Sequence, residues 1–273
     1  NMFDSIAGDY DALNHILSLD VDKIWRKKAL KQIVDAPAPV QVLDLACGTG
    51  DFSIAIAKAL SEPLSLSKRL DSEEAAFRQA QRPTHAVTEP VEVIGASVVG
   101  EPSRTTSSAT GSHVTGVDLS EGMLAVMREK VGKAGLADMI SIEEGDGETL
   151  RFPDNTFDRV TIAFGIRNFE NREKGLREML RVLKPGGRLV ILELSRPENK
   201  IIRWFYDLYF LHILPKIGGK VSGDKAAYAY LPTSVAAFPG KMAFLATMRK
   251  AGFRAVTHKA FTLGICRMYT GEK

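Results

Sequence analysis

The turn within residues 42–51 has the residue types and the spacing of a nucleotide-binding site. It reads V-L-D-L-A-C-G-T-G-D, and a helix-like run follows over residues 52–60. A buried strand that ends in a glycine turn and leads into a helix is typical of nucleotide-binding α/β proteins. Because glycine has no Cβ, Gly48 and Gly50 would let a ligand approach the backbone closely.

Two carboxylates flank this turn and restrict the ligand that it can hold. Asp44 precedes the glycines and Asp51 follows them. Their negative charge would repel the pyrophosphate of a dinucleotide, whereas it would attract an ammonium or a sulfonium group. We therefore expect S-adenosylmethionine (SAM) rather than NAD. A dehydrogenase would also need a third glycine close to the position of Ser53.

Strands and helices alternate along the chain around this turn. We expect strands at 40–46, 113–118, 139–144, 157–164 and 188–194, and helices at 52–60, 121–134 and 172–183. This alternation predicts a doubly wound, mostly parallel sheet. Two more strands, 254–261 and 264–270, are separated by a short connection, so they should form a hairpin with an antiparallel last strand. The expected fold is the Rossmann-like α/β fold of class I methyltransferases, with seven strands, a reversed last strand and a helical N-terminal cap.

Residues 61–112 interrupt this alternation and are rich in Ser, Thr, Glu, Arg and Pro. Rossmann-type sites carry an acidic residue roughly 20 positions after the glycine turn. The candidate, Asp118, lies 68 positions after Gly50 (118 − 50), and removing the segment would restore the usual separation. We therefore expect a single domain over residues 1–273 with a flexible insertion. The insertion is either a tolerated solvent-exposed segment or a partner-binding one.

Composition and charge exclude several classes of protein. The chain is 45% hydrophobic and 25% charged with a net charge of +3, and no dense run of basic residues indicates nucleic-acid binding. The two cysteines and the histidines and carboxylates show no metal-ligand spacing, so we expect no metal. No apolar run reaches the roughly 18 residues of a spanning helix, so the cytoplasm is the expected location.

Four stretches resemble the menaquinone/ubiquinone-biosynthesis C-methyltransferases. They are Y-D-A-L-N-H-I-L-S-L-D-V-D-K-I-W at 10–25, F-P-D-N-T-F-D at 152–158, A-F-G-I-R-N at 163–168 and R-V-L-K-P-G-G-R-L-V-I-L-E-L-S at 181–195. The resemblance extends over the chain except 61–112. It departs at Leu13 and Asp22, where that family usually has Met and His. It implies SAM-dependent C-methylation of a polyprenylated quinol in respiratory quinone biosynthesis, in particular of demethylmenaquinol to menaquinol.

The residues that we expect to bind SAM follow the ends of the predicted strands. Gly48, Thr49 and Gly50 should surround the methionine end of SAM, and Asp118 should accept hydrogen bonds from both ribose hydroxyls. Asp146 should accept a hydrogen bond from the adenine amino group. The complete expected set is Asp44, Gly48, Thr49, Gly50, Asp118, Leu119, Met123, Asp146, Gly147 and Ala163. The contact of Ala163 is implied by the resemblance.

The substrate site must remove a proton as well as accept a methyl group. Loss of a phenol proton makes the ring carbon nucleophilic, and some group must receive or relay that proton. Arg167 and Asn168 follow the strand at 157–164. Because arginine stays protonated, Arg167 should stabilise the phenolate or hold a water that takes the proton; the alternative is a structural salt bridge. Tyr10 is the third candidate catalytic residue, and Asn14 and Phe164 are expected to contact substrate. The resemblance implies that the segment with Tyr10 and Asn14 closes the pocket.

Residues 201–214, I-I-R-W-F-Y-D-L-Y-F-L-H-I-L, are the most apolar stretch outside the predicted sheet. The stretch is too short to span a bilayer. Its apolar residues surround the expected helix, which argues against a free surface helix. It could line a channel for a prenyl tail, dock on a membrane near Lys216 and Lys220, or pack as a buried helix or a dimer contact.

Alternatives to quinol methylation remain open at this point. The expected partner is a polyprenylated quinol, with peripheral contact to the inner face of the membrane and a homodimer as further options. A methyltransferase for another small molecule would act on a water-soluble phenol and on no prenylated quinol. A SAM-binding module without catalysis would bind SAM in a calorimeter and transfer no methyl group.

Overall fold

A computed structural model describes residues 21–61, 111–209 and 225–273, although not the side chains of 225–229. Tyr10 and Asn14 lie outside the described residues. So do 62–110 of the expected insertion and the second part of the apolar stretch at 201–214.

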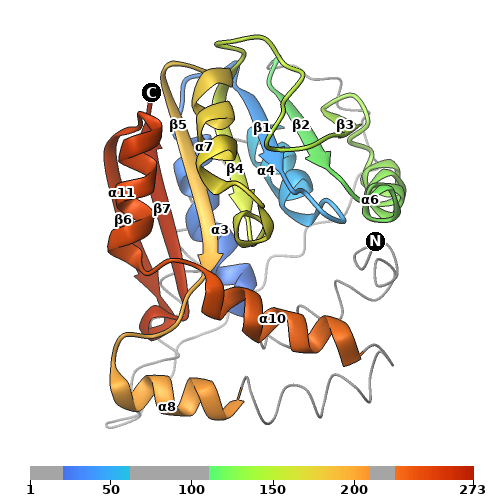
Figure 1. Ribbon diagram of the computed structural model, residues 1–273. Coiled ribbons are helices and arrows are strands. Elements are labelled where there is room, and N and C mark those ends of the chain that lie inside the picture. Colours follow the sequence, from blue (N-terminus) through green and yellow to red (C-terminus); the bar gives the residue numbers. More distant parts are fainter. Residues whose placement is uncertain (1–20, 62–110, 210–224) are drawn as a thin grey trace, which may run out of the picture.

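Seven strands form one sheet in the order β3-β2-β1-β4-β5-β7-β6 (Figure 1). The strands are β1 (Gln41–Leu45), β2 (His113–Asp118), β3 (Ile140–Glu144), β4 (Phe157–Ala163), β5 (Leu183–Leu194), β6 (Arg254–Phe261) and β7 (Cys266–Glu272). The pairings among β1 to β5 are parallel, whereas β7 is antiparallel to both β5 and β6. The predicted seven-stranded sheet with a reversed last strand is confirmed.

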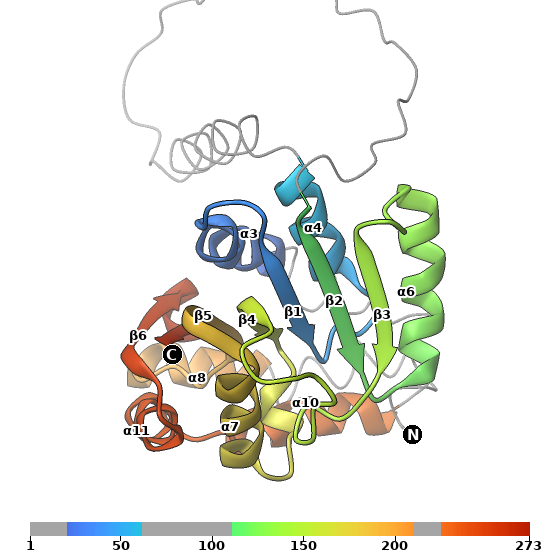
Figure 2. The same cartoon turned by 90° about the horizontal axis from the view of Figure 1, so that it is seen from above.

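Helices cover both faces of this sheet (Figure 2). One face carries α3 (Val21–Val34), α4 (Asp51–Ser61) and α6 (Glu121–Ala134), and the other carries α7 (Arg172–Val182) and α11 (Lys241–Ala251). Alternate strand residues belong to opposite faces: Val190 packs in the first apolar cluster and Ile191 in the second. Because both faces of the sheet are covered, both alternating sets of strand residues are buried, and a central strand such as β5 includes a continuous apolar run.

Two further helices lie beyond the carboxyl ends of the parallel strands, α8 (Lys200–Leu208) and α10 (Lys225–Ala237) (Figure 1). Two short 3₁₀ helices, η1 (Ile166–Asn168) and η3 (Thr262–Gly264), follow β4 and β6. Ligands of open α/β sheets bind at this carboxyl edge. A ligand site is therefore expected between the carboxyl ends of the strands and α8.

Local signals explain where several elements begin and end. Ser120 caps α6 by accepting a hydrogen bond from the Met123 amide, and Gly135 ends that helix with a positive φ of 64°. β5 begins at Leu183 rather than near Arg188, because the segment before Arg188 continues the strand across a register shift opposite β4. β7 begins at Cys266, two residues later than expected, because η3 occupies the start of the hairpin connection.

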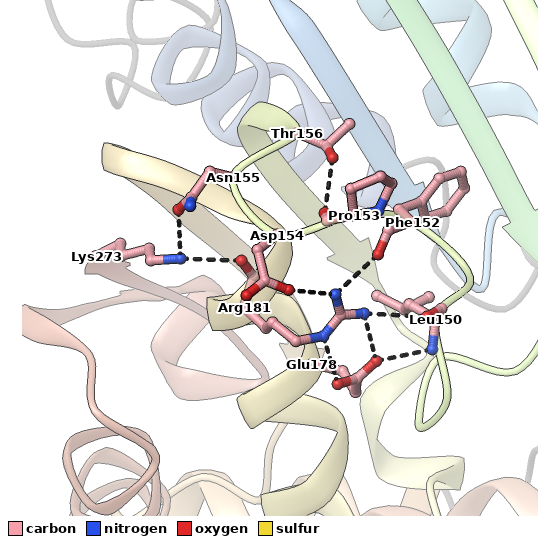
Figure 3. Close-up of polar contacts among 9 residues, drawn as sticks. All are labelled: Leu150, Phe152, Pro153, Asp154, Asn155, Thr156, Glu178, Arg181 and Lys273. Atoms are coloured by element: carbon pink, nitrogen blue, oxygen red, sulfur yellow. Dashed lines mark hydrogen bonds and ion pairs between the residues drawn. The ribbon is translucent and has the colours of Figure 1, made fainter.

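The loop between β3 and β4 is fixed by one arginine on α7 (Figure 3). Arg181 donates hydrogen bonds to the backbone carbonyls of Leu150 and Phe152, and it forms ion pairs with Asp154 and Glu178. Glu178 also accepts a hydrogen bond from the Leu150 amide at 2.9 Å. These contacts tie down the part of the loop that follows the turn with Asp146.

Gly50 is the glycine whose replacement we expect to be most damaging. Its φ is +84°, and a Cβ at this position would lie 2.4 Å from Cγ of the buried Met127. We expect Gly50→Ala to lower the free energy of unfolding by about 1–3 kcal/mol, from strain and overpacking together. Denaturant titration measures this change.

A second glycine provides the matched control for that substitution. Gly132 lies inside α6, and an added Cβ would meet no atom within 4 Å. Gly132→Ala should therefore raise the free energy of unfolding by about 0.4–1 kcal/mol. Equal effects of the two substitutions would contradict the conformation assigned to the turn at Gly50.

Candidate active site

Two cavities meet at the carboxyl edge of the sheet. The larger has a volume of about 500 Å³ and lies between α3, the turn after β1, η3 and α8. The smaller, of about 350 Å³, lies beyond the ends of β2 and β3. Four residues line both cavities: Ala46, Gly48, Ala163 and Phe164. A ligand in the smaller cavity could therefore present one end to a second molecule in the larger.

The glycine turn after β1 is held by the carboxylate of Asp118 at the end of β2. Its Oδ2 accepts a hydrogen bond from the Gly48 amide at 2.8 Å, and its Oδ1 accepts one from the Ser120 amide at 2.9 Å. Gly48 itself has a positive φ of 57°. One side chain thus fixes both the turn and the start of α6, and it also lines the smaller cavity.

The remaining wall of the smaller cavity comes from the turn after β3 and from α6. Oδ1 of Asp146 accepts a hydrogen bond from the Glu148 amide at 2.8 Å. Its Oδ2 lies 3.5 Å from the Thr149 hydroxyl, which donates to it. At Gly147, a Cβ would come within 2.5 Å of the Phe169 ring, so this position requires glycine unless the ring moves. The predicted residues that line this cavity are Gly48, Asp118, Leu119, Met123, Asp146, Gly147, Ala163, Phe164 and Asn168.

Asp44 is fully buried and lines the larger cavity. Its Oδ2 accepts a hydrogen bond from the Ser53 hydroxyl at 2.6 Å, whereas its Oδ1 has no hydrogen-bond partner within the described part of the chain. Burial raises the pKa of Asp44 to about 7, against the opposing effects of the Ser53 hydrogen bond and the charge of Arg26. A buried carboxylate oxygen that lacks a partner is suited to a cationic group of a ligand.

Arg167 lines the larger cavity and is held by a buried ion pair. Its Nη1 lies 2.9 Å from Oε1 of Glu193 on β5, and its backbone amide donates to Oε2 of the same residue. Its guanidinium also donates to the Phe164 carbonyl and, at 3.3 Å, to the Ser234 hydroxyl. Arg167 is therefore a structural ion-pair partner and also part of the cavity wall, whereas its role towards a substrate stays a prediction.

Asn168 lies apart from Arg167, although the two are adjacent in sequence. It lines the smaller cavity, not the larger one, and its Oδ1 accepts a hydrogen bond from the Tyr230 hydroxyl at 2.9 Å.

Two other residues of the glycine turn, Thr49 and Asp51, line the larger cavity. Lys130 forms an ion pair with Asp51 and donates a hydrogen bond to the Thr49 hydroxyl. Gly50 lines neither cavity, so its place in the site is that of a turn residue.

Three polar or aromatic residues of α3 line the larger cavity although the sequence did not predict them as site residues: Asp22, Trp25 and Arg26. Arg26 lies over the Phe164 ring at 5.7 Å, and its Nε lies 3.6 Å from the buried Oδ2 of Asp22. Trp25 packs near the same ring and donates a hydrogen bond to the Thr262 hydroxyl at 2.9 Å. All three fall in or next to the stretch at 10–25, but no periodicity there indicates which side chains face a cavity.

The larger cavity is predominantly apolar. Its apolar and aromatic lining residues are Val21, Trp25, Phe52, Phe164, Leu194, Ile202, Phe205, Tyr206, Tyr209, Leu231, Leu263 and Ile265. Burial raises the pKa of the Tyr206 hydroxyl, so this group stays protonated at neutral pH. Loss of charge in a reaction is favoured in such surroundings, because water is excluded.

Within residues 21–61, 111–209 and 225–273, no three His, Cys, Asp or Glu side chains gather closely enough to hold a metal ion. The same ranges contain no helix long and apolar enough to cross a membrane.

The sheet with its reversed strand, and the glycine turn between two cavities at its carboxyl edge, define the class as methyltransferase-like. A solved SAM-dependent methyltransferase from Aquifex aeolicus has the same fold, with a TM-score of 0.52 and 18% identity over 90% of this chain and 88% of that one. The chain matches the model of the ubiE/COQ5 methyltransferase family over residues 1–273 and belongs to that family.

Two relatives illustrate this membership. The "Ubiquinone/menaquinone biosynthesis C-methyltransferase UbiE" of Geobacter sulfurreducens is 41% identical over 273 residues, which is 100% of this chain and 87% of the relative. The "Demethylmenaquinone methyltransferase" of Bacteroides fragilis is 38% identical over 272 residues, 100% of this chain and 91% of the relative. The family inferred from the four sequence stretches is thereby confirmed.

Proposed function

We propose that this protein transfers the methyl group of SAM to a ring carbon of a polyprenylated quinol and converts demethylmenaquinol to menaquinol. The names of relatives 38–41% identical over the whole chain support this proposal. The observation that carries it is the pair of cavities with a shared wall, since one suits an adenosyl ligand and the other an apolar ring. The protein works at the cytoplasmic face of the membrane, where such a substrate resides.

The residues of the smaller cavity would hold the adenosine part of SAM. A carboxylate offers about four lone-pair sites, so Asp118 could accept hydrogen bonds from the ribose hydroxyls as well as from the Gly48 and Ser120 amides. Asp146 and Gly147 would face the adenine ring, with Met123 and Leu119 beside it.

The turn between the cavities would hold the methionine part of SAM. Gly48 and Thr49 present backbone and hydroxyl groups there, and Asp44 supplies the buried carboxylate oxygen that matches an ammonium group. The fit of this oxygen to a cation supports SAM over an anionic cofactor. When bound, SAM supplies an electrophilic methyl group on a positively charged sulfur.

The residues of the larger cavity would bind and activate the quinol ring. Phe164 and Trp25 offer aromatic surfaces, and the apolar wall excludes water from a step in which charge disappears. Arg167 stabilises the phenolate that forms when the ring loses its proton, directly or through a bound water. Glu193 positions Arg167 and holds its charge in place. The roles predicted for Tyr10 and Asn14 stay predictions, since both lie outside the described residues.

We expect the affinity for SAM to depend on pH through Asp44. With a pKa of about 7 in the free protein, this carboxyl group is mainly protonated at pH 6, and a bound ammonium group favours its ionised form. Binding then releases a proton, so affinity should rise roughly fivefold to tenfold from pH 6 to pH 7.5 and level off above. Calorimetric titration of SAM across this range measures the effect.

Asp44→Asn is the variant that tests this assignment. It keeps the size of the side chain but cannot ionise, so its weaker SAM binding should be nearly independent of pH in the same range. A pH dependence that survives in this variant would assign the proton to another group.

The substrate is tested with a panel of acceptors and labelled SAM. We expect methyl transfer to demethylmenaquinol, and a lower rate with a ubiquinone precursor of the same tail length. Transfer to a water-soluble phenol alone would replace the proposal with methylation of another small molecule. Binding of SAM without transfer to any acceptor would indicate a module without catalysis.

A further inference from the structure

Five large apolar side chains on α8 and η3 are exposed beside the larger cavity, and we call them the rim patch. Their exposed fractions are 69% for Ile201, 61% for Trp204, 60% for Phe205, 39% for Leu208 and 72% for Leu263. The four residues of α8 recur at intervals of three and four, so they share one side of the helix. This arrangement differs from a helix buried on all sides, one of the alternatives left open by the sequence, because only part of the helix surface packs inward.

The rim patch is continuous with the cavity. Phe205 and Leu263 line the cavity while remaining largely exposed, although they come from different elements. The inward side of α8 adds Ile202 and Tyr206 to the same lining. α8 lies at the outer edge of the molecule, beyond the strand ends (Figure 1). An apolar chain that leaves the cavity between these residues would emerge in the middle of the patch.

Basic side chains predominate beside the rim patch. Arg196, Lys200, Arg203 and Lys241 are the cations on or next to α8. Among the described residues on or next to α8, Asp207 and Glu198 are the carboxylates that oppose them. Asp207 pairs with Arg196, and Glu198 pairs with Lys241 and Arg267. The excess of positive charge favours a surface that carries negative charge.

We propose that the rim patch docks on an anionic lipid bilayer, so that the ring of a prenylated substrate enters the larger cavity directly from the lipid. This inference rests on the proposed function and names the surface that serves it. An amphipathic helix with Trp and Phe on one side and basic residues beside it lies in the plane of the bilayer interface. The membrane is favoured over a protein partner because two residues of the patch, Phe205 and Leu263, also line the cavity that a lipid-soluble substrate would enter.

The test removes apolar side chains of the patch that do not line the cavity. Ile201→Gln/Trp204→Gln replaces two exposed side chains, so the fold should be kept. Met242→Gln is the matched control, since Met242 is 63% exposed on α11 and lies outside the patch. Binding is measured by co-sedimentation with phosphatidylcholine vesicles, with and without phosphatidylglycerol. Activity is measured with a long-tailed quinol in vesicles and with a short-tailed, water-soluble quinol without vesicles.

We expect the wild-type protein and Met242→Gln to bind the anionic vesicles more tightly than the neutral ones, and less tightly at high salt. The double variant should bind at least about tenfold more weakly and lose activity on the long-tailed quinol in vesicles. It should keep its activity on the short-tailed quinol.

Unchanged vesicle binding by the double variant would overturn the docking proposal. A dimeric wild-type protein and a monomeric double variant in analytical ultracentrifugation would also overturn it, because the patch would then be a contact between copies of the chain. If the wild-type protein binds vesicles but methylates neither quinol, the proposed function fails while the docking surface stands.

Discussion

Arg167→Ala will lower the turnover number by roughly 10²–10³-fold and leave the dissociation constant for SAM within about threefold. The reason is that Arg167 lines the larger cavity but not the smaller one, so its charge acts on the acceptor ring. Stabilisation of a developing phenolate in an apolar cavity is worth several kcal/mol. Steady-state kinetics with demethylmenaquinol, together with calorimetric SAM binding, measure the two quantities separately.

The ion pair with Glu193 requires a control for this prediction. Removing the guanidinium leaves Glu193 buried without its partner, which costs about 3–5 kcal/mol of stability. The double variant Arg167→Ala/Glu193→Gln removes the stranded charge, so it should recover much of the lost stability but none of the turnover. Turnover that returns together with stability would show that Arg167 acts only as a structural partner. Loss of SAM affinity in Arg167→Ala would also contradict its assignment to the acceptor.

Asp118→Ala will weaken SAM binding by roughly 10–100-fold. The substitution removes a charge-assisted acceptor for the ribose, and one such hydrogen bond contributes about 1.5–3 kcal/mol. It also releases the Gly48 amide, so the turn that separates the two cavities loses its anchor. Asp118→Asn keeps one side-chain acceptor and should show a smaller loss. Calorimetric titration of each variant with SAM gives the comparison.

The net charge of the protein changes in that experiment as well, and Asp138 supplies the control. Asp138 is exposed and lines neither cavity. Asp138→Ala removes the same charge and should leave the dissociation constant for SAM unchanged. An Asp118→Ala variant that binds SAM as tightly as Asp138→Ala would remove Asp118 from the site.

The fold could be predicted from the sequence because its signals are local. Buried strands, the glycine turn and the short connection before the last strand each act within a few residues. Asp118 was harder to recognise, because its separation from the glycine turn becomes normal only once 61–112 is treated as an insertion. The bounds of β5 were harder to predict, because a register shift depends on how β4 and β5 pair in three dimensions.

Two contacts of the candidate site could not be predicted from the sequence, because they form only through tertiary packing. Glu193 lies 26 positions from Arg167 in the sequence and becomes its partner only because β4 and β5 are neighbours. Arg26 reaches Phe164 through the packing of α3, which no sequence period reveals. The exposure of Trp204 could not be predicted from composition either, because an exposed apolar segment beside a cavity and an apolar segment in a core have similar sequences.

One experiment tests the central claim most directly. The purified protein is incubated with SAM carrying a ¹³C-labelled methyl group and with demethylmenaquinol, and the product is examined by NMR. We predict a single new methyl signal on a ring carbon of the quinol. A methyl signal on oxygen, or unreacted quinol in the presence of bound SAM, would contradict the account.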